Sequence, residues 1–90
     1  MKVFFLERSS REFNKLDNSI KERIKEKLKK LESMPELGKP LKHSTFWSLR
    51  IGDYRVIYEI DKNNKKIIIL TVKHRKDVYE NFDKIFLIFF

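Results

Sequence analysis

Two arginines flank a two-residue turn in the second half of the chain, and their chemistry suits a bound phosphate. The turn Gly52-Asp53 has glycine first, as a type II′ hairpin requires, so a hairpin through it places Arg50 directly opposite Arg55. Like charges in that position destabilise a sheet, so the pair is either solvated on an exposed face or used to bind an anion. Because a guanidinium donates two hydrogen bonds to one phosphate, Arg50 and Arg55 are candidate catalytic residues.

A second pair follows the last expected strand. Arg75 and Tyr79 are four residues apart, which puts them on one face of a helix that we expect to begin near Arg75 and to end near Phe82. A cation opposes the dipole at a helix N-terminus, so Arg75 makes better sense there as an anion ligand beside free amides. Tyr79 is either part of this site or an aromatic residue that packs at its rim.

Four further residues are candidates for RNA contacts. Lys73 and His74 end the last strand; His74 either transfers protons or is a strand-end residue bonded to a backbone carbonyl. Lys39 and Lys42 lie in the loop before the arginine hairpin, where loops on a rigid sheet often carry function, although single loop lysines are common.

The overall charge favours a polyanionic partner. The chain carries 21 basic and 13 acidic residues, a net charge of +8, which suits nucleic acid, the ribosome or an acidic protein. Residues 21–30 alone hold six basic residues and two glutamates. That stretch is either a solvated helix face or a source of non-specific attraction to RNA.

Composition excludes several other classes. There are no cysteines, and the two histidines are not spaced as metal ligands, so we expect no cofactor and no metal. The apolar runs 67–70 and 85–90 are far shorter than the roughly 20 residues that span a bilayer. The N-terminus does not resemble a secretory signal. We expect a cytoplasmic protein with a single domain over residues 1–90.

The hydrophobic pattern predicts an α+β fold with helices packed on a four-stranded sheet. We expect a strand over 2–6 and an αα-hairpin whose second helix has apolar residues at a spacing of four, four and three. Capping boxes at Ser9–Glu12 and Ser19–Glu22 are expected to begin the two helices. A three-stranded antiparallel meander then covers about 46–51, 54–60 and 66–73, after a loop over 35–44.

The third strand of the meander is apolar on both faces, which predicts a central position in the sheet. Its second face therefore needs a cover, and the C-terminal helix and the apolar run 85–90 are the candidates. That run is alternatively a ridge for a partner or a dimer contact.

Two segments, PLKHSTFWSLRIGDYRVIYEI and VKHRKDVY, resemble the RelE/ParE toxin superfamily, and most closely the RelE-like mRNA interferases. The order of elements over nearly the whole chain is similar to that fold. The resemblance implies a toxin of a type II toxin–antitoxin system that enters the ribosomal A site. There it cleaves mRNA by 2′-hydroxyl attack on the adjacent phosphate, without a metal, and a RelB-like antitoxin covers it.

By position in these segments, the resemblance implies that Arg55 stabilises the charged transition state. Arg75 stabilises the phosphate or protonates the leaving group, Tyr79 acts as the base, and Arg50 fills a basic position. Lysines of the family's second strand are replaced here by Phe46 and Ser48, and Lys42 or Lys39 are the candidates to supply that charge from the loop. The alternatives are a ParE-like inhibitor of DNA gyrase and a basic RNA-binding module without catalysis.

Overall fold

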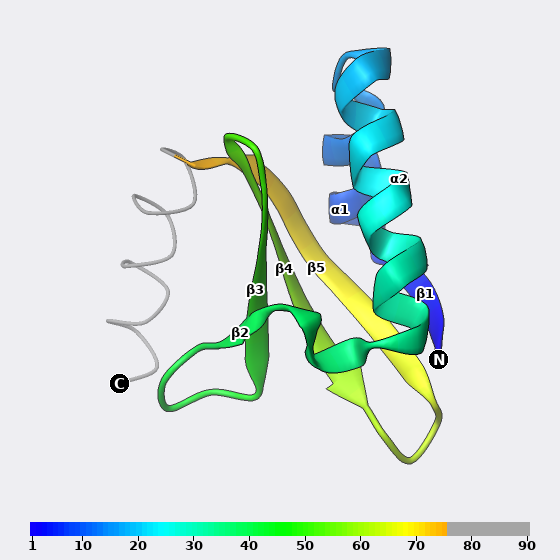
Figure 1. Cartoon of the computed structure of the whole chain (residues 1–90), viewed down its shortest axis with the longest axis vertical. Helices are drawn as coiled ribbons and strands as arrows, with labels where there is room; N and C mark the ends of the chain where they lie inside the picture. The colour runs from blue at the N-terminus through cyan, green and yellow to red at the C-terminus, as the bar shows by residue number, and fades with distance from the viewer. Residues whose placement is uncertain (76–90) are drawn as a thin grey trace.

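The computed structural model describes residues 1–75, in which two α-helices lie on one side of a five-stranded sheet (Figure 1). The strand order is β1-β5-β4-β3-β2, with β1 parallel to β5 and the other neighbours antiparallel. The α+β class and the expected element order to the end of the meander are confirmed. The elements are β1 (Lys2–Phe5), α1 (Glu7–Asn14), α2 (Asn18–Ser33), the 3-10 helix η1 (Pro35–Leu37), β2 (Lys39–Pro40), β3 (Phe46–Ile51), β4 (Tyr54–Asp61) and β5 (Lys66–His74).

Two expectations fall beyond this range. The C-terminal helix after Arg75, with Tyr79, and the apolar run 85–90 lie outside the described residues. The cover of the second sheet face therefore stays a prediction.

The expected four-stranded sheet is wrong by one strand, because the loop before the meander contains β2. Lys39 and Pro40 pair with the facing residues Ser48 and Trp47 of β3. Proline lacks an amide hydrogen and is tolerated at such an edge position. Nothing in the loop's composition marks two residues as a strand, since the pairing depends on contacts made by β4.

The hydroxyl of Tyr58, on β4, holds the loop against the sheet through two hydrogen bonds. The Gly38 amide donates to Tyr58 Oη at 3.0 Å, and the hydroxyl donates to the Pro35 carbonyl at 2.8 Å. A Cβ on Gly38 would lie 2.6 Å from the Ser48 carbonyl oxygen, so only glycine allows this close approach. The loop is thereby held against β3.

Both predicted capping boxes are wrong. α1 begins at Glu7, so Ser9 lies inside it, fully buried, with its hydroxyl 2.7 Å from the Ile69 carbonyl. α2 begins at Asn18 with Asp17 as its N-cap, and neither N-cap makes a side-chain hydrogen bond. In α1 the serine bonds across to β5 instead, because tertiary contacts outweigh the local preference.

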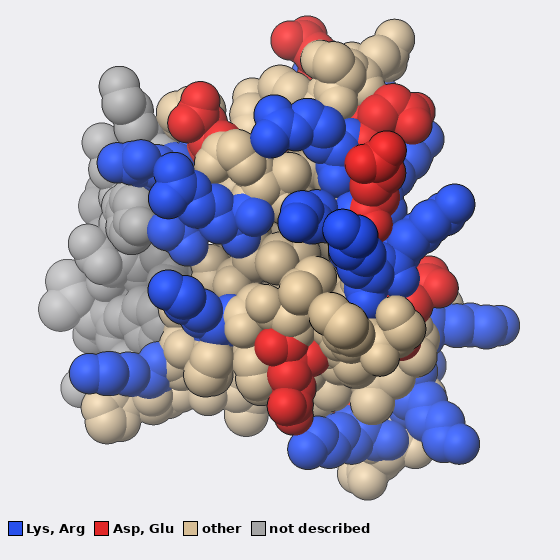
Figure 2. Space-filling model, in the orientation of Figure 1, with Lys and Arg blue, Asp and Glu red and all other residues tan. Residues whose placement is uncertain are grey.

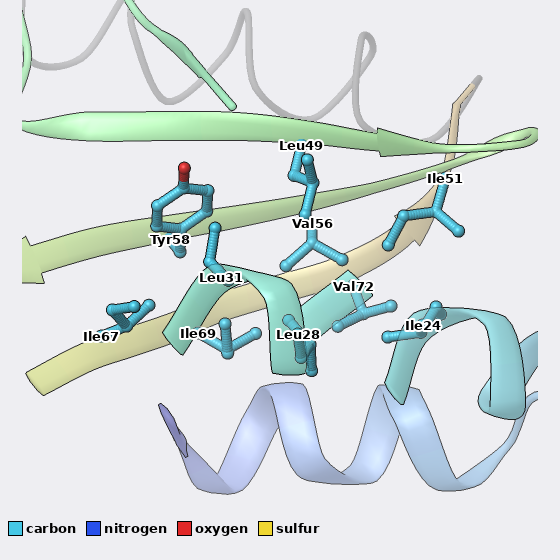
Figure 3. Close-up of a cluster of buried hydrophobic side chains, with 10 residues drawn as sticks. All are labelled: Ile24, Leu28, Leu31, Leu49, Ile51, Val56, Tyr58, Ile67, Ile69 and Val72. Carbon is cyan, nitrogen blue, oxygen red and sulfur yellow. The ribbon is translucent and has the colours of Figure 1, made fainter. Parts of the chain in front are cut away.

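The core forms where the apolar stripe of α2 meets the sheet (Figure 3). Ile24, Leu28 and Leu31 project from α2 toward the strands, as the four-and-three spacing predicts. Each buried side chain of this size stabilises the fold by about 1.5–3 kcal/mol. The facing residues of the sheet are Leu49, Ile51, Val56, Tyr58, Ile67, Ile69 and Val72.

A β-bulge in β5 changes which residues face the core. Tyr58 pairs with Ile69 and Ile57 pairs with Thr71, which leaves Leu70 as the extra residue. After it the inward positions change from odd to even numbers, so Ile69 and Val72 are both buried. The residues that follow are therefore displaced by one position relative to strict alternation. β5 is central, between β1 and β4, as its apolar run predicts.

Candidate functional site

Three basic residues lie side by side across the sheet. Arg50 of β3 pairs with Arg55 of β4, as the hairpin turn predicts, and Arg55 pairs in turn with Lys73 of β5. Directly paired residues share a face, and the next pair, Val56 with Val72, is buried under the helices. Arg50, Arg55 and Lys73, called here the cation row, therefore lie on the sheet face away from the helices.

Arg55 is half-buried and oriented by a neighbour on β3. Its Nη1 donates to Ser48 Oγ at 3.1 Å, and Ser48 is only 6% exposed. Ser48 stands where the resemblance leads one to expect a lysine. A neutral acceptor at this position orients the guanidinium, whereas a lysine would repel it.

The Arg50 side chain points the other way along β3. Its Nε donates to the Gly52 carbonyl at 3.2 Å. Gly52 follows Arg50 in the chain, whereas Ser48, the partner of Arg55, precedes it. The paired arginines thus share a register position, but their guanidinium groups diverge. Gly52 has a φ of 59°, the left-handed value that the glycine-first turn requires.

Lys73 forms an ion pair with a carboxylate of α1. Its Nζ lies 3.2 Å from Glu12 Oε2 on α1, and Arg8 lies 3.7 Å from the same oxygen. The other oxygen of Glu12 accepts hydrogen bonds from the Thr71 hydroxyl at 2.7 Å and from the Val72 amide at 3.2 Å. Glu12 thus holds α1 to the part of β5 that lies beyond its pairing with β1.

Two strand-end residues take different positions. His74 pairs with Tyr54 on the face opposite the cation row, and their rings meet edge to face with centroids 5.4 Å apart. Arg75 is exposed, and its amide donates to the Asp53 carbonyl at 2.7 Å. Arg75 and Arg50 therefore both contact the β3–β4 turn, and Tyr79 lies outside the described residues.

One of the two loop lysines, Lys39, lies in β2, and the other, Lys42, lies in the turn that joins β2 to β3. Lys39 is exposed and pairs across the sheet with Ser48, which is the residue that orients Arg55. Lys42 is exposed in the turn after β2, and this turn is closed by a 2.9 Å hydrogen bond from the Leu41 amide to the Phe46 carbonyl. The structure thus brings Lys39 near Arg55's partner and leaves Lys42 at the loop.

The sequence alone did not identify Ser48 and Glu12 as residues that orient the site. A signal for Ser48 was present, since it is a small polar residue flanked by Trp47 and Leu49 in an apolar strand. Within residues 1–75, no group of three or more His, Asp and Glu side chains gathers as metal ligands would. No helix in that range is long and apolar enough to cross a bilayer.

A family model described as the ParE toxin of type II toxin–antitoxin systems matches residues 3–79, and the chain belongs to this RelE/ParE toxin family. Toxin RelG from Mycobacterium tuberculosis is a relative that is 46% identical over 46 residues. That match covers 48% of this chain and 52% of the relative, so it spans about half the relative's length.

Solved structures show the same fold. The RelBE2 toxin–antitoxin complex of Mycobacterium tuberculosis matches with a TM-score of 0.76 and 33% identity, over 82% of this chain and 96% of that chain. The archaeal RelE–RelB complex of Pyrococcus horikoshii OT3 has a TM-score of 0.72 and 28% identity, over 82% and 93%. The isolated E. coli RelE toxin shares the fold, with a TM-score of 0.73 and 24% identity over 91% and 94%.

Proposed function

We propose that this type II toxin is a ribosome-dependent endoribonuclease that cleaves mRNA in the A site. The observation that supports this most is Arg55, a half-buried guanidinium oriented by Ser48 within the cation row. An oriented cation stabilises charge that develops on a phosphate without the cost of reorganising at the moment of reaction.

The proposed reaction needs charge stabilisation and proton transfer. The 2′-hydroxyl attacks the adjacent phosphorus, the bond to the 5′-oxygen breaks, and a 2′,3′-cyclic phosphate forms. In this scheme Arg55 stabilises the equatorial oxygens, and Arg75 stabilises the phosphate or protonates the leaving oxygen. Tyr79 takes the proton from the 2′-hydroxyl, which requires nearby cations to lower the pKa of a tyrosine from its usual value of about 10.

The remaining basic residues are proposed to hold the RNA. Lys39 lies beside Ser48, and Lys42 is exposed on the same loop, so both are placed to contact backbone phosphates. Lys73 can join them only at the expense of its ion pair with Glu12. His74 shares its face with Tyr54 and not with Arg55, which makes it the weakest of the RNA-contact candidates.

A RelB-like antitoxin is the proposed protein partner. The solved relatives from Mycobacterium tuberculosis and Pyrococcus horikoshii are complexes of this kind. A target on the ribosome places the toxin's action in the cytoplasm.

Inhibition of DNA gyrase is the second candidate, because the matching family model is described as a ParE toxin. A gyrase inhibitor acts by binding, so it does not need Arg55 as a catalytic group. A variant such as Arg55→Ala that no longer cleaves RNA but is still toxic to cells would favour gyrase inhibition.

The test is in vitro translation with ribosome-bound mRNA, with cuts mapped by primer extension. Wild-type protein is compared with Arg55→Ala, Arg75→Ala and Tyr79→Phe, and with Arg11→Ala, an exposed arginine of α1 that is not a member of the cation row. We expect A-site cuts with the wild type and Arg11→Ala, and a loss of about a hundredfold in rate for Arg55→Ala. Intact mRNA at protein concentrations that stop translation would contradict the proposal, and a gyrase assay would follow.

A further inference from the structure

A groove with basic walls lies where α2 passes the β3–β4 turn. Its volume is about 390 Å³. In Figure 2, Lys and Arg side chains flank both sides of the strip between α2 and this turn. The residues that line this space, called here the basic groove, are Arg23, Glu26, Lys27, Lys30, Arg50, Ile51 and Gly52.

Two arginines from different elements, Arg23 of α2 and Arg50 of β3, each lie against Gly52 in the turn that lines this groove. A Cβ on Gly52 would lie 3.2 Å from both terminal nitrogens of Arg23, so the Arg23 guanidinium lies over the turn. Arg50 Nε donates to the carbonyl of the same glycine at 3.2 Å. The absence of a side chain at Gly52 leaves room for the Arg23 guanidinium over the turn.

The lining favours phosphates over a protein segment. Four cations face the space and Glu26 is the one carboxylate among the seven lining residues, so the groove carries a net positive charge. Ile51 is its one branched apolar side chain, and it is buried in the core. An acidic helix would find little apolar surface to anchor it there, whereas phosphates need only charge and donors.

We propose that the basic groove binds backbone phosphates of RNA at a second site, separate from Arg55. Arg50 projects from the sheet face away from the helices and joins this site at the turn, because its side chain bends toward Gly52 and away from Ser48. The turn connects the two sites, since the Arg75 amide is bonded to Asp53, the residue after Gly52. An RNA strand held in the groove is thereby led over the turn toward the cation row. The inference rests on the RNA target of the proposed function and does not depend on cleavage.

The experiment measures RNA binding by the full chain through fluorescence anisotropy. The probe is an unstructured, fluorescein-labelled single-stranded RNA, titrated at several KCl concentrations. Lys27→Gln/Lys30→Gln removes two groove cations, and Lys25→Gln/Lys29→Gln is the matched control: the same helix, the same change in charge and no groove residue. All four are solvent-accessible helix positions, where glutamine keeps helix propensity.

The slope of log Kd against log salt concentration distinguishes RNA binding in the groove from non-specific electrostatic attraction to the whole protein surface. Each phosphate contact to a single strand contributes about 0.7 to that slope, so the groove variant should lose about 1.4 and the control much less. Equal slopes for the two variants would overturn the inference, as would no RNA binding by the wild type at low salt. A groove-dependent affinity for polyglutamate, with RNA binding unchanged, would also overturn it and assign the groove to an acidic protein.

The result is independent of the cleavage test. Groove-dependent RNA binding by a protein that leaves ribosome-bound mRNA intact would support the groove and contradict the proposed endoribonuclease. A-site cleavage with equal slopes in the two double variants would support the enzyme and contradict the groove.

Discussion

Ser48 Oγ accepts a 3.1 Å hydrogen bond from Nη1 of Arg55, its diagonal neighbour across β3 and β4. The serine is almost fully buried, so this contact is shielded from water and is made to a charged group. Hydrogen bonds of that kind are stronger than neutral ones. Arg55 is thus held in one direction while its paired residue Arg50 turns to the other.

Ser48→Ala is expected to lower the rate of mRNA cleavage about tenfold, because Arg55 is no longer held at the angle that faces the phosphate. Ser48 acts through Arg55, so kcat should fall while KM changes little. Stability should fall by only about 1 kcal/mol. Single-turnover cleavage on ribosomes measures this. Ser33→Ala, an exposed serine at the end of α2, is the control, and an unchanged kcat in Ser48→Ala would refute the positioning role.

Glu12→Gln is expected to tighten RNA binding by the toxin. The substitution removes the carboxylate that lies 3.2 Å from Lys73 Nζ and releases that cation for a phosphate. The amide oxygen still accepts from Thr71 and Val72, which limits the loss of stability to about 1 kcal/mol. Anisotropy titration checks the affinity. Glu7→Gln, on the same helix with the same change in charge, is the control, and an equal gain in both variants would mean that Lys73 does not contact RNA.

Tyr58→Phe is expected to destabilise the toxin by about 1–2 kcal/mol at neutral pH, because the Gly38 amide and the Pro35 carbonyl lose their shared partner. Urea unfolding at pH 7 measures the difference between the two proteins.

We also expect the stability of the wild type and that of Tyr58→Phe to depend differently on pH. Burial raises the pKa of Tyr58 above its ordinary value of 10.0, with the Gly38 amide opposing and Glu36 reinforcing the shift. A raised folded-state pKa gives stability that is present below about pH 10 and is lost as the pH rises through the folded value. Wild-type stability should therefore fall faster above about pH 10 than that of Tyr58→Phe. Parallel curves would show that Tyr58 does not titrate with unfolding.

Gly38→Ala is expected to detach β2 from β3. The new Cβ would lie 2.6 Å from the Ser48 carbonyl oxygen and 2.8 Å from Tyr58 Oη, and a carbonyl inside a sheet cannot move away freely. The cost is about 1–3 kcal/mol. Faster hydrogen exchange at the Lys39 and Leu41 amides would report the detachment. Glu36→Ala in the same loop is the control, and wild-type exchange rates in Gly38→Ala would contradict the expectation.

The sequence alone determined the features that depend on neighbours in the chain. The period of the apolar residues identified α2 and its buried face, and the strand bounds were correct within a residue. The glycine-first turn predicted that Arg50 pairs with Arg55, because a two-residue hairpin leaves only one register. The family resemblance was readable for the same reason, since its two segments cover these local elements.

Only the tertiary structure decided where the other charged and polar residues lie. Strict alternation would put Lys73 on the same face as the buried Ile69, but the bulge at Leu70 moves it beside Arg55. Glu12 and Ser9 suited a capping box, yet each bonds to β5, about 60 residues away. The basic groove joins α2 to a turn that follows it much later in the chain. Side chains choose between local and distant partners by the packing of the whole sheet, and that packing is not encoded in any short window of sequence.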